Sequence, residues 1–178
     1  SSDLKFPFRF ERIPFHQFDG LPLTFAQLGS GASSQPFKTV KDYDNWLKRI
    51  DASTAWCRVA ISRFREGLAE DYVLPKVLVE KMVGQMLDKT IVSDDPTQSL
   101  FYQPIDKLPD GFSPEDKARL TAAYRRATEE QLIPAYRQLG EFLRDEYLPH
   151  ARQSTGILAL EGGREQYRYW VHGWTTTE

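Results

Sequence analysis

The stretch "TVKDYDNWLKRI" (residues 39–50) indicates most directly what kind of fold this chain has. Large apolar side chains recur in it every three or four residues, namely Tyr43, Trp46, Leu47 and Ile50. An α-helix has about 3.6 residues per turn, so this spacing places all four on one face. Thr39 stands just before the stripe, where its hydroxyl can cap the first turn. The stretch therefore predicts an amphipathic helix.

The same spacing continues toward the C-terminus and predicts further helices. We expect a second helix from near Ser53, whose apolar stripe is Trp56, Val59, Ala60, Phe64 and Leu68. Pro75 suits the first turn of a third helix, and Ser113 with Pro114 suits the start of a fourth. A last short helix is expected over Arg164–His172.

Pro134 lies inside the long helical pattern that runs from Leu120 to Tyr147. It removes one backbone hydrogen bond and crowds the carbonyl of Glu130, which costs about 3 kcal/mol in a straight helix. We therefore expect a kink or two abutting helices there, and Pro149 to bend or end the second half. Together these patterns predict an all-α fold, a bundle-like array with one long kinked helix.

The first 38 residues have a different composition. They contain seven of the eleven phenylalanines: Phe6, Phe8, Phe10, Phe15, Phe18, Phe25 and Phe37. Such a segment is too apolar for a solvated tail, so we expect it to be irregular and docked, with Phe15 and Phe18 buried. Polar and apolar residues alternate over Lys5–Arg12, which is compatible with one short edge strand. We divide the chain into an extended wrapping segment, 1–38, and a helical part, 39–178; alternatively, the rings cover a face meant for another part of the protein.

Composition excludes some classes of protein. The chain has 178 residues, a net charge of −2 and one cysteine. A dedicated nucleic-acid binder usually has a strong basic excess, so no nucleic-acid partner is expected. No apolar run approaches the roughly 18 residues of a membrane span. One cysteine fits the cytoplasm but also an exported or periplasmic protein, so the compartment stays open.

Few residues in the sequence suggest a catalytic or metal-binding site. His16, His150 and His172 lie far apart in sequence, and no HExxH motif is present. Glu146 and His150 have the spacing of half a metal site, although a histidine near a helix C-terminus more often interacts with the helix dipole. Cys57 is interpreted as a small buried residue. We therefore assign no catalytic residue and no metal ligand.

The densest unusual cluster lies near the C-terminus, where aromatic residues alternate with arginines: Arg164, Tyr167, Arg168, Tyr169, Trp170, His172 and Trp174. Aromatic rings beside arginines suit a ligand surface. The competing interpretation is that Tyr167, Trp170 and Trp174 form a buried core stripe. Both interpretations stay open from the residues alone.

The final residues, Thr175-Thr176-Thr177-Glu178, have the form of a helix capping box. Gly173 suits the end of the preceding helix. Because a capping box begins a helix, we expect that a further helix follows and that this chain is part of a longer protein, truncated at both ends.

Several stretches together resemble a known family. These are "IPFHQFDGLPLTFAQL", "QPFKTVKDYDNWLKRI", "REGLAEDYVLPKVLVEKMVGQM", "LIPAYRQLGEFLRDEYLPHARQSTGILALEGG" and "YRYWVHGWTTTE". In order and spacing they resemble the bacterial domain of unknown function 885 (DUF885), and this chain matches its middle portion. Its most specific parts are Gln35-Pro36-Phe37 with Tyr43, the Pro-Ala-Tyr and Arg-Asp-Glu-Tyr-Leu-Pro run, and the terminal threonines.

The resemblance implies a large, mainly helical, zinc-peptidase-like protein whose zinc helix lies well beyond the terminal threonines. Zinc and a peptide substrate are thus implied for the full-length protein, and no cofactor is implied for this chain. None of the three histidines matches a family ligand.

We therefore expect the chain to supply scaffold and one wall of a substrate cleft, with Tyr167, Arg168, Trp170, Thr175, Thr176 and Thr177 as candidate wall residues. The alternative is a non-catalytic helical interaction module. In either case the expected partners include the remaining parts of the same protein or another copy of the chain.

Overall fold

The computed structural model describes residues 9–175, and the side chain of Phe10 is not described. Its α-helices are α1 (Leu21–Gly29), α2 (Val40–Ala69), α3 (Lys76–Met86), α4 (Gln103–Asp106), α5 (Pro114–Ala127), α6 (Ile133–Phe142) and α7 (Gly163–Thr175). Over the described residues there is no strand, so the predicted all-α class is confirmed. The strand considered over Lys5–Arg12 is not seen in its described part, where Phe10–Arg12 forms a 3₁₀ turn.

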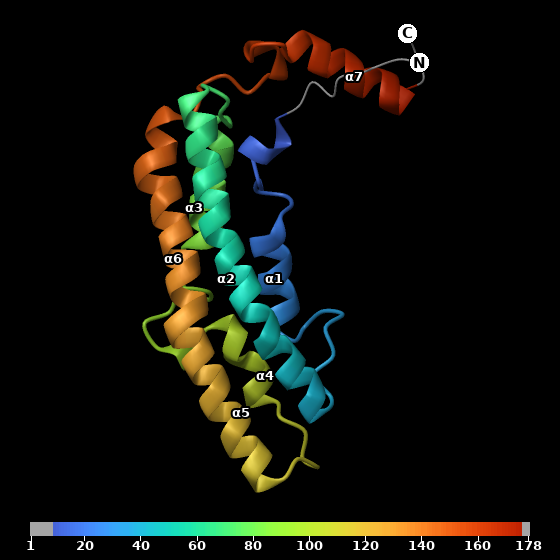
Figure 1. The fold of residues 1–178 in the computed structure, drawn as a ribbon, viewed down its shortest axis with the longest axis vertical. Coiled ribbons are helices and arrows are strands. Elements are labelled where there is room, and N and C mark those ends of the chain that lie inside the picture. Colours follow the sequence, from blue (N-terminus) through green and yellow to red (C-terminus); the bar gives the residue numbers. More distant parts are fainter. Residues whose placement is uncertain (1–8, 176–178) are drawn as a thin grey trace.

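The helices form an elongated bundle (Figure 1). α2 runs along the line made by α5 and α6, α3 packs against α6, and α1 packs against α2. α7 lies across one end of the bundle, at a steep angle to its long axis. This helix packs mainly against the short 3₁₀ turn Ile157–Ala159 rather than against the bundle helices.

α2 begins as the sequence predicts. The Thr39 hydroxyl accepts a hydrogen bond from the backbone of Asp42, and the Asp42 carboxylate accepts one from the backbone of Thr39. These bonds to the charged form lower the pKa of Asp42. The capping box satisfies two of the donors that a helix start leaves unpaired.

The predicted break before Ser53 is wrong, because α2 continues through this point to Ala69. Between Val40 and Glu66 the helix contains neither proline nor glycine, so nothing in the backbone interrupts it. The inward face is also rotated from the predicted stripe. Val59 is 54% exposed, whereas Cys57 and Ile61 are buried.

The long kinked helix is confirmed, and its kinks have a defined form. α5 and α6 are joined by a π-helical turn, Thr128–Leu132, in which the N–H of Ile133 donates to the carbonyl of Thr128. This wide turn immediately precedes Pro134, whose ring would crowd a regular helix. A second π turn, Leu143–Tyr147, precedes Pro149, and the helix then ends in a 3₁₀ turn.

Buried tyrosines tie distant segments to the core. The hydroxyl of Tyr136 donates to the carbonyl of Pro22 at 2.6 Å, and that of Tyr43 donates to the carbonyl of Pro104 at 3.0 Å. The Tyr147 hydroxyl accepts from the backbone N–H of Leu74 at 2.9 Å. Burial raises the pKa of Tyr136 and raises that of Tyr147 to about 12, so both rings stay neutral at physiological pH.

Tyr136→Phe is expected to lower the free energy of unfolding by about 1–3 kcal/mol, because the buried carbonyl of Pro22 then loses its donor. Urea unfolding followed by circular dichroism measures the change. Tyr167→Phe is the matched control, since its ring is 54% exposed and its loss of a hydroxyl should be nearly neutral. Equal stability of the two variants would show that the hydrogen bond from Tyr136 to Pro22 does not stabilise the fold.

The N-terminal segment is docked, but in a different way from that expected. Phe15 is only 2% exposed, whereas Phe18 is 84% exposed, so the predicted burial of Phe18 is wrong. Leu21–Gly29 forms a helix instead of extended chain, because its apolar residues Phe25 and Ala26 pack inward against α2. The turn before it is held by Arg12, which forms ion pairs with Glu66 and Glu70 of α2 and its C-cap.

Candidate functional site

α7 carries the aromatic cluster, and the structure leaves its rings largely outside the core. Tyr167 is 54%, Trp170 37% and Trp174 80% exposed. The buried residues of α7 are instead Gly163 and Gln166. The interpretation of a core stripe is therefore wrong, and these rings belong to a surface.

The other wall candidates are less informative. Arg168 is exposed on α7. Thr175 lies in the last turn of α7, where its hydroxyl donates to the carbonyl of Val171 at 2.6 Å. The predicted helix end at Gly173 is therefore wrong, because α7 continues through Gly173 to Thr175. Thr176 and Thr177 lie outside the described residues, as does most of the predicted capping box.

An apolar hollow of about 570 Å³ lies between α7 and the end of the bundle. Three separate segments form it: the turn before α1, the α2–α3 link, and the chain leading into α7. Its apolar lining comes mainly from Ile13, Pro14, Phe15, Leu74, Leu78, Ile157, Leu160 and Trp170. Of the four wall candidates that the structure describes, Trp170 alone lines this hollow. Apolar hollows of this size are typical of ligand sites.

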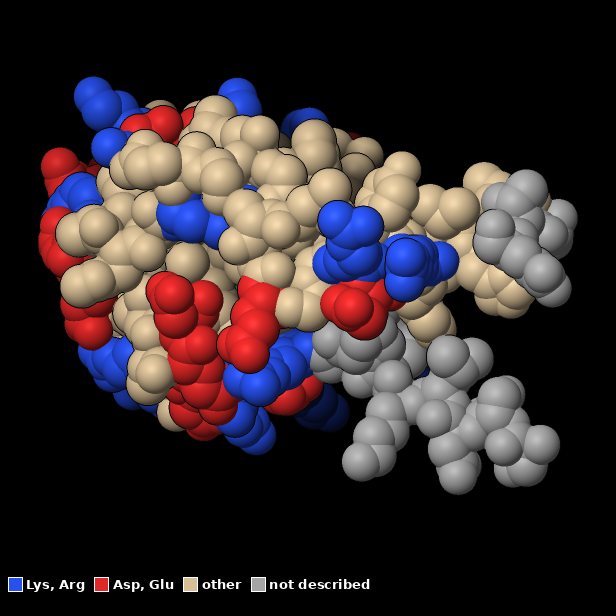
Figure 2. Space-filling view, turned by 90° about the horizontal axis from the view of Figure 1, so that it is seen from above, with Lys and Arg blue, Asp and Glu red and all other residues tan. Residues whose placement is uncertain are grey.

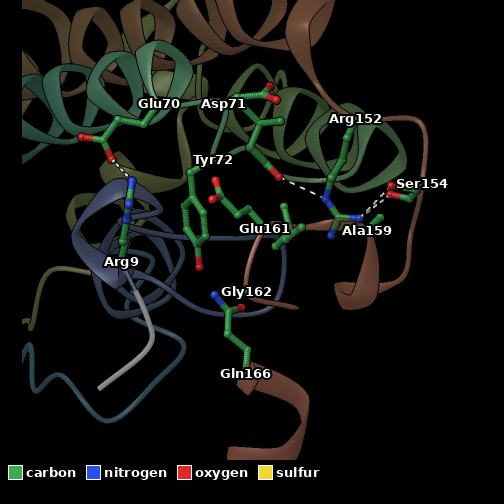
Figure 3. Close-up of a pocket in the computed structure, with 12 residues that line it drawn as sticks. Arg9, Glu70, Asp71, Tyr72, Arg152, Ser154, Ala159, Glu161, Gly162 and Gln166 are labelled. Carbon is green, nitrogen blue, oxygen red and sulfur yellow. Dashed lines mark hydrogen bonds and ion pairs between the residues drawn. The ribbon is translucent and has the colours of Figure 1, made fainter. Parts of the chain in front are cut away.

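A second, more polar hollow of about 380 Å³ adjoins the first (Figure 3). The two share five lining residues: Tyr72, Val73, Arg152, Leu160 and Gln166. Its charged residues include Asp71 and Glu161, and Arg9 pairs there with Glu70 at 2.7 Å. We call the two together the end site.

Arg152 lies at the junction of the two hollows and is partly buried. Its Nε donates to the carbonyl of Val73 at 3.1 Å. Its Nη1 donates to the carbonyls of Ser154 and Gly156, at 2.6 and 2.9 Å, and to the Ser154 hydroxyl. Figure 3 shows the bonds to Ser154 leaving the guanidinium on one side and another bond leaving it on the opposite side. Burial lowers the pKa of Arg152, because desolvation disfavours its charge.

The uncharged character of this end is visible from outside. Figure 2 looks onto it and shows broad uncharged areas, between which basic and acidic side chains lie next to one another. The final turns of α7, from Tyr169 to Thr175, contain no Lys, Arg, Asp or Glu. The last turns of α7, which bring Trp170 to the end site, are therefore an uncharged part of its surroundings.

The residues considered for metal binding do not come together. Glu146 forms a two-pronged ion pair with Arg65, at 2.9 and 2.6 Å, rather than facing His150. The ring of His16 accepts from the backbone N–H of Phe18. Burial raises the pKa of Cys57 to about 11, so its thiol is not a reactive thiolate. Over residues 9–175 no three His, Cys, Asp or Glu side chains are grouped so as to hold a metal ion.

Comparison with known proteins places the chain in a family. The family model described as "Bacterial protein of unknown function (DUF885)" matches residues 3–178. The chain belongs to the DUF885 family. The resemblance stated from sequence is thereby confirmed. No curated protein matches this DUF885 chain.

A solved structure shows the same fold. It is titled "The crystal structure of the putative lipoprotein from Colwellia psychrerythraea" and superimposes with a TM-score of 0.79 at 20% sequence identity. The match covers 92% of the DUF885 chain but only 28% of that protein. In the described part of the chain, no helix is both long and apolar enough to cross a membrane.

Sequence reasoning missed most of the end site. Arg152, Tyr72 and Leu160 lie in connecting segments where no periodicity singles them out. A partial signal existed for Phe15, which was expected to be buried, and for Trp170, which was named as a wall candidate. Their convergence depends on chain segments far apart in sequence, so no local pattern could predict it.

Proposed function

We propose that this chain is the helical scaffold of a larger zinc-dependent, peptidase-like protein and forms one wall of its substrate cleft. The observation that carries the proposal is the apolar hollow beneath α7, which both Trp170 and Arg152 line. Apolar walls with a few polar groups orient an extended ligand while excluding water. The DUF885 membership and the 28% coverage of the solved neighbour support a role within a larger protein.

Zinc enters the proposal only through the family resemblance. The described residues offer no group that fits a metal ion, so no metal-dependent step is derived from them. A bound zinc would polarise a scissile carbonyl and activate water. The proposal assigns its ligands to another part of the protein, and this chain contributes binding and orientation.

The full-length protein tests this proposal. We expect it to cleave peptides, to contain zinc and to lose activity on chelation. Trp170→Ala should raise KM for peptide more than it lowers kcat, because Trp170 lines the hollow. Val59→Ala is the control, since Val59 is similarly exposed on α2, outside both hollows.

The isolated 178-residue chain should bind no stoichiometric zinc and cleave no peptide. Elemental analysis and a peptide-cleavage assay on both proteins distinguish the outcomes. One tightly held zinc per isolated chain would overturn the placing of the metal site elsewhere. A metal-free, inactive full-length protein would count against the peptidase.

A second candidate is a non-catalytic interaction module. It is favoured by the exposed apolar side chains of the C-terminal segment, Leu158, Tyr167 and Trp174. Exposed apolar patches often mark interfaces. The partner would be another part of the same protein or a second copy. Sedimentation of the chain at increasing concentration checks this. If the chain stays monomeric at every concentration, a second copy is excluded as the partner. If it associates, Trp174→Ala should weaken the association.

A further inference from the structure

Arg152 has binding capacity that the fold does not use. Its Nε and Nη1 bond to the link before α3 and to the loop after Ala151, which explains its position. Its Nη2 donates to no group in the described part of the chain. A guanidinium presents its donors as a fixed planar fork, so the remaining nitrogen has a defined direction.

The charge of Arg152 is also not balanced. All its hydrogen-bond acceptors are uncharged carbonyl or hydroxyl oxygens. Asp19 lines one hollow and Glu70, Asp71 and Glu161 line the other. None of these carboxylates forms an ion pair with Arg152, and Glu70 pairs with Arg9 and Arg12 instead. A partly buried cation whose hydrogen-bond acceptors are all neutral gains free energy when an anion pairs with it.

The surroundings of Arg152 restrict what kind of anion fits. On the side of the larger hollow the walls are apolar, contributed by Phe15, Leu74, Leu78 and Ile157. Arg152 is the one Lys or Arg among the described residues that line this hollow. A single guanidinium matches one negative charge, whereas a phosphate dianion would keep excess charge beside apolar walls. The match is therefore to a carboxylate that carries an apolar side chain.

We propose that Arg152 binds the C-terminal carboxylate of a peptide whose last side chain enters the apolar hollow. This inference rests on the proposed function, because it names the part of the peptide that the cleft wall recognises. The carboxylate would accept from Nη2, and such charge-assisted hydrogen bonds are short and strong. Trp170 lines the same hollow, so it would contact the apolar side chain.

The direct test compares two probes on the 178-residue chain: N-acetyl-Phe-Leu with a free C-terminal carboxylate, and the same dipeptide as its C-terminal amide. We expect the acid to bind at least about tenfold more tightly, measured by NMR titration at low salt, since charged hydrogen bonds exceed neutral ones by this order. The indole signal of Trp170 should shift with the acid. Equal binding of the two probes, or binding of neither, overturns the proposal.

Variants locate the effect. Arg152→Gln should abolish the discrimination between acid and amide. Arg126→Gln should preserve it, because Arg126 is exposed near the end of α5 and pairs with Glu130 of the following π turn, away from both hollows. Since Arg152 also holds the loop, a thermal melt accompanies each variant. If Arg152→Gln unfolds, the wild-type comparison of acid and amide still decides the matter.

The result is separable from the proposed function. If the full-length protein is active but the chain shows no preference for the acid, the carboxylate subsite is wrong and the peptidase stands. If the full-length protein is inactive while the chain prefers the acid, the subsite stands and the peptidase is wrong.

Discussion

Phe15→Ala is expected to lower the free energy of unfolding by about 3–5 kcal/mol, the usual cost of deleting a buried phenylalanine ring. The ring is 2% exposed and packs edge-on against Phe64 of α2, with a centroid separation of 5.4 Å, and against Trp56 at 6.2 Å. Deleting it leaves a cavity between the N-terminal segment and α2, and removes part of the wall of the apolar hollow.

Phe18→Ala is the matched control. It removes the same ring three residues away from a position that is 84% exposed, so its effect should lie within about 0.5 kcal/mol. Chemical denaturation of both variants, with the wild type, measures the difference. If Phe15→Ala unfolds at the same denaturant concentration as the wild type, the N-terminal segment is not docked as described.

The helical parts of the fold were predictable because their signals are local. The Thr39 cap and the stripe after it specify the start of α2, and Ser113, whose hydroxyl accepts from the backbone of Asp116, specifies the start of α5. The break expected before Ser53 is wrong because the apolar stripe changes direction there while the helix continues. A 30-residue helix can change the neighbours it packs against along its length without breaking.

The form of the proline kinks and the helix in the N-terminal segment were harder to predict. A proline signals that a regular helix is disturbed, but Pro134 does not say whether a kink, a break or a π turn will result. α1 is only nine residues long and has no side-chain cap, so its stability comes from burying Phe25 and Ala26. That burial depends on α2, which local sequence does not show.

Of the candidate site, only the residue on α7, Trp170, was named from the sequence as a site residue. Trp170 was named because aromatic rings and arginines cluster there. Arg152 was not, because a single arginine in a loop has no distinguishing pattern. Its significance comes from which oxygens it meets and from the apolar residues around it, both of which depend on tertiary structure.

Gly20→Ala is the second change expected to have a large effect. Gly20 is the N-cap residue of α1, with φ 147° and ψ 163°, and its carbonyl accepts the first helical bond from Thr24. Residues other than glycine rarely adopt this backbone conformation, and forcing one into it costs about 1–3 kcal/mol. An added methyl group would also overlap the Cβ of Phe15, and overpacking typically costs about 1–3 kcal/mol more.

Gly84→Ala provides the opposite control. Gly84 lies within α3, is exposed, and has open space where a methyl group would be added. Alanine is favoured over glycine inside a helix, so this variant should be more stable than the wild type by about 0.5–1 kcal/mol. In the same urea titration the free energy of unfolding should be lower than that of the wild type for Gly20→Ala and higher for Gly84→Ala.

Because the added methyl pushes on Phe15, Gly20→Ala should also reduce binding of N-acetyl-Phe-Leu under conditions where the variant stays folded. A Gly20→Ala protein as stable as the wild type would show that this turn does not fix Phe15 in the core.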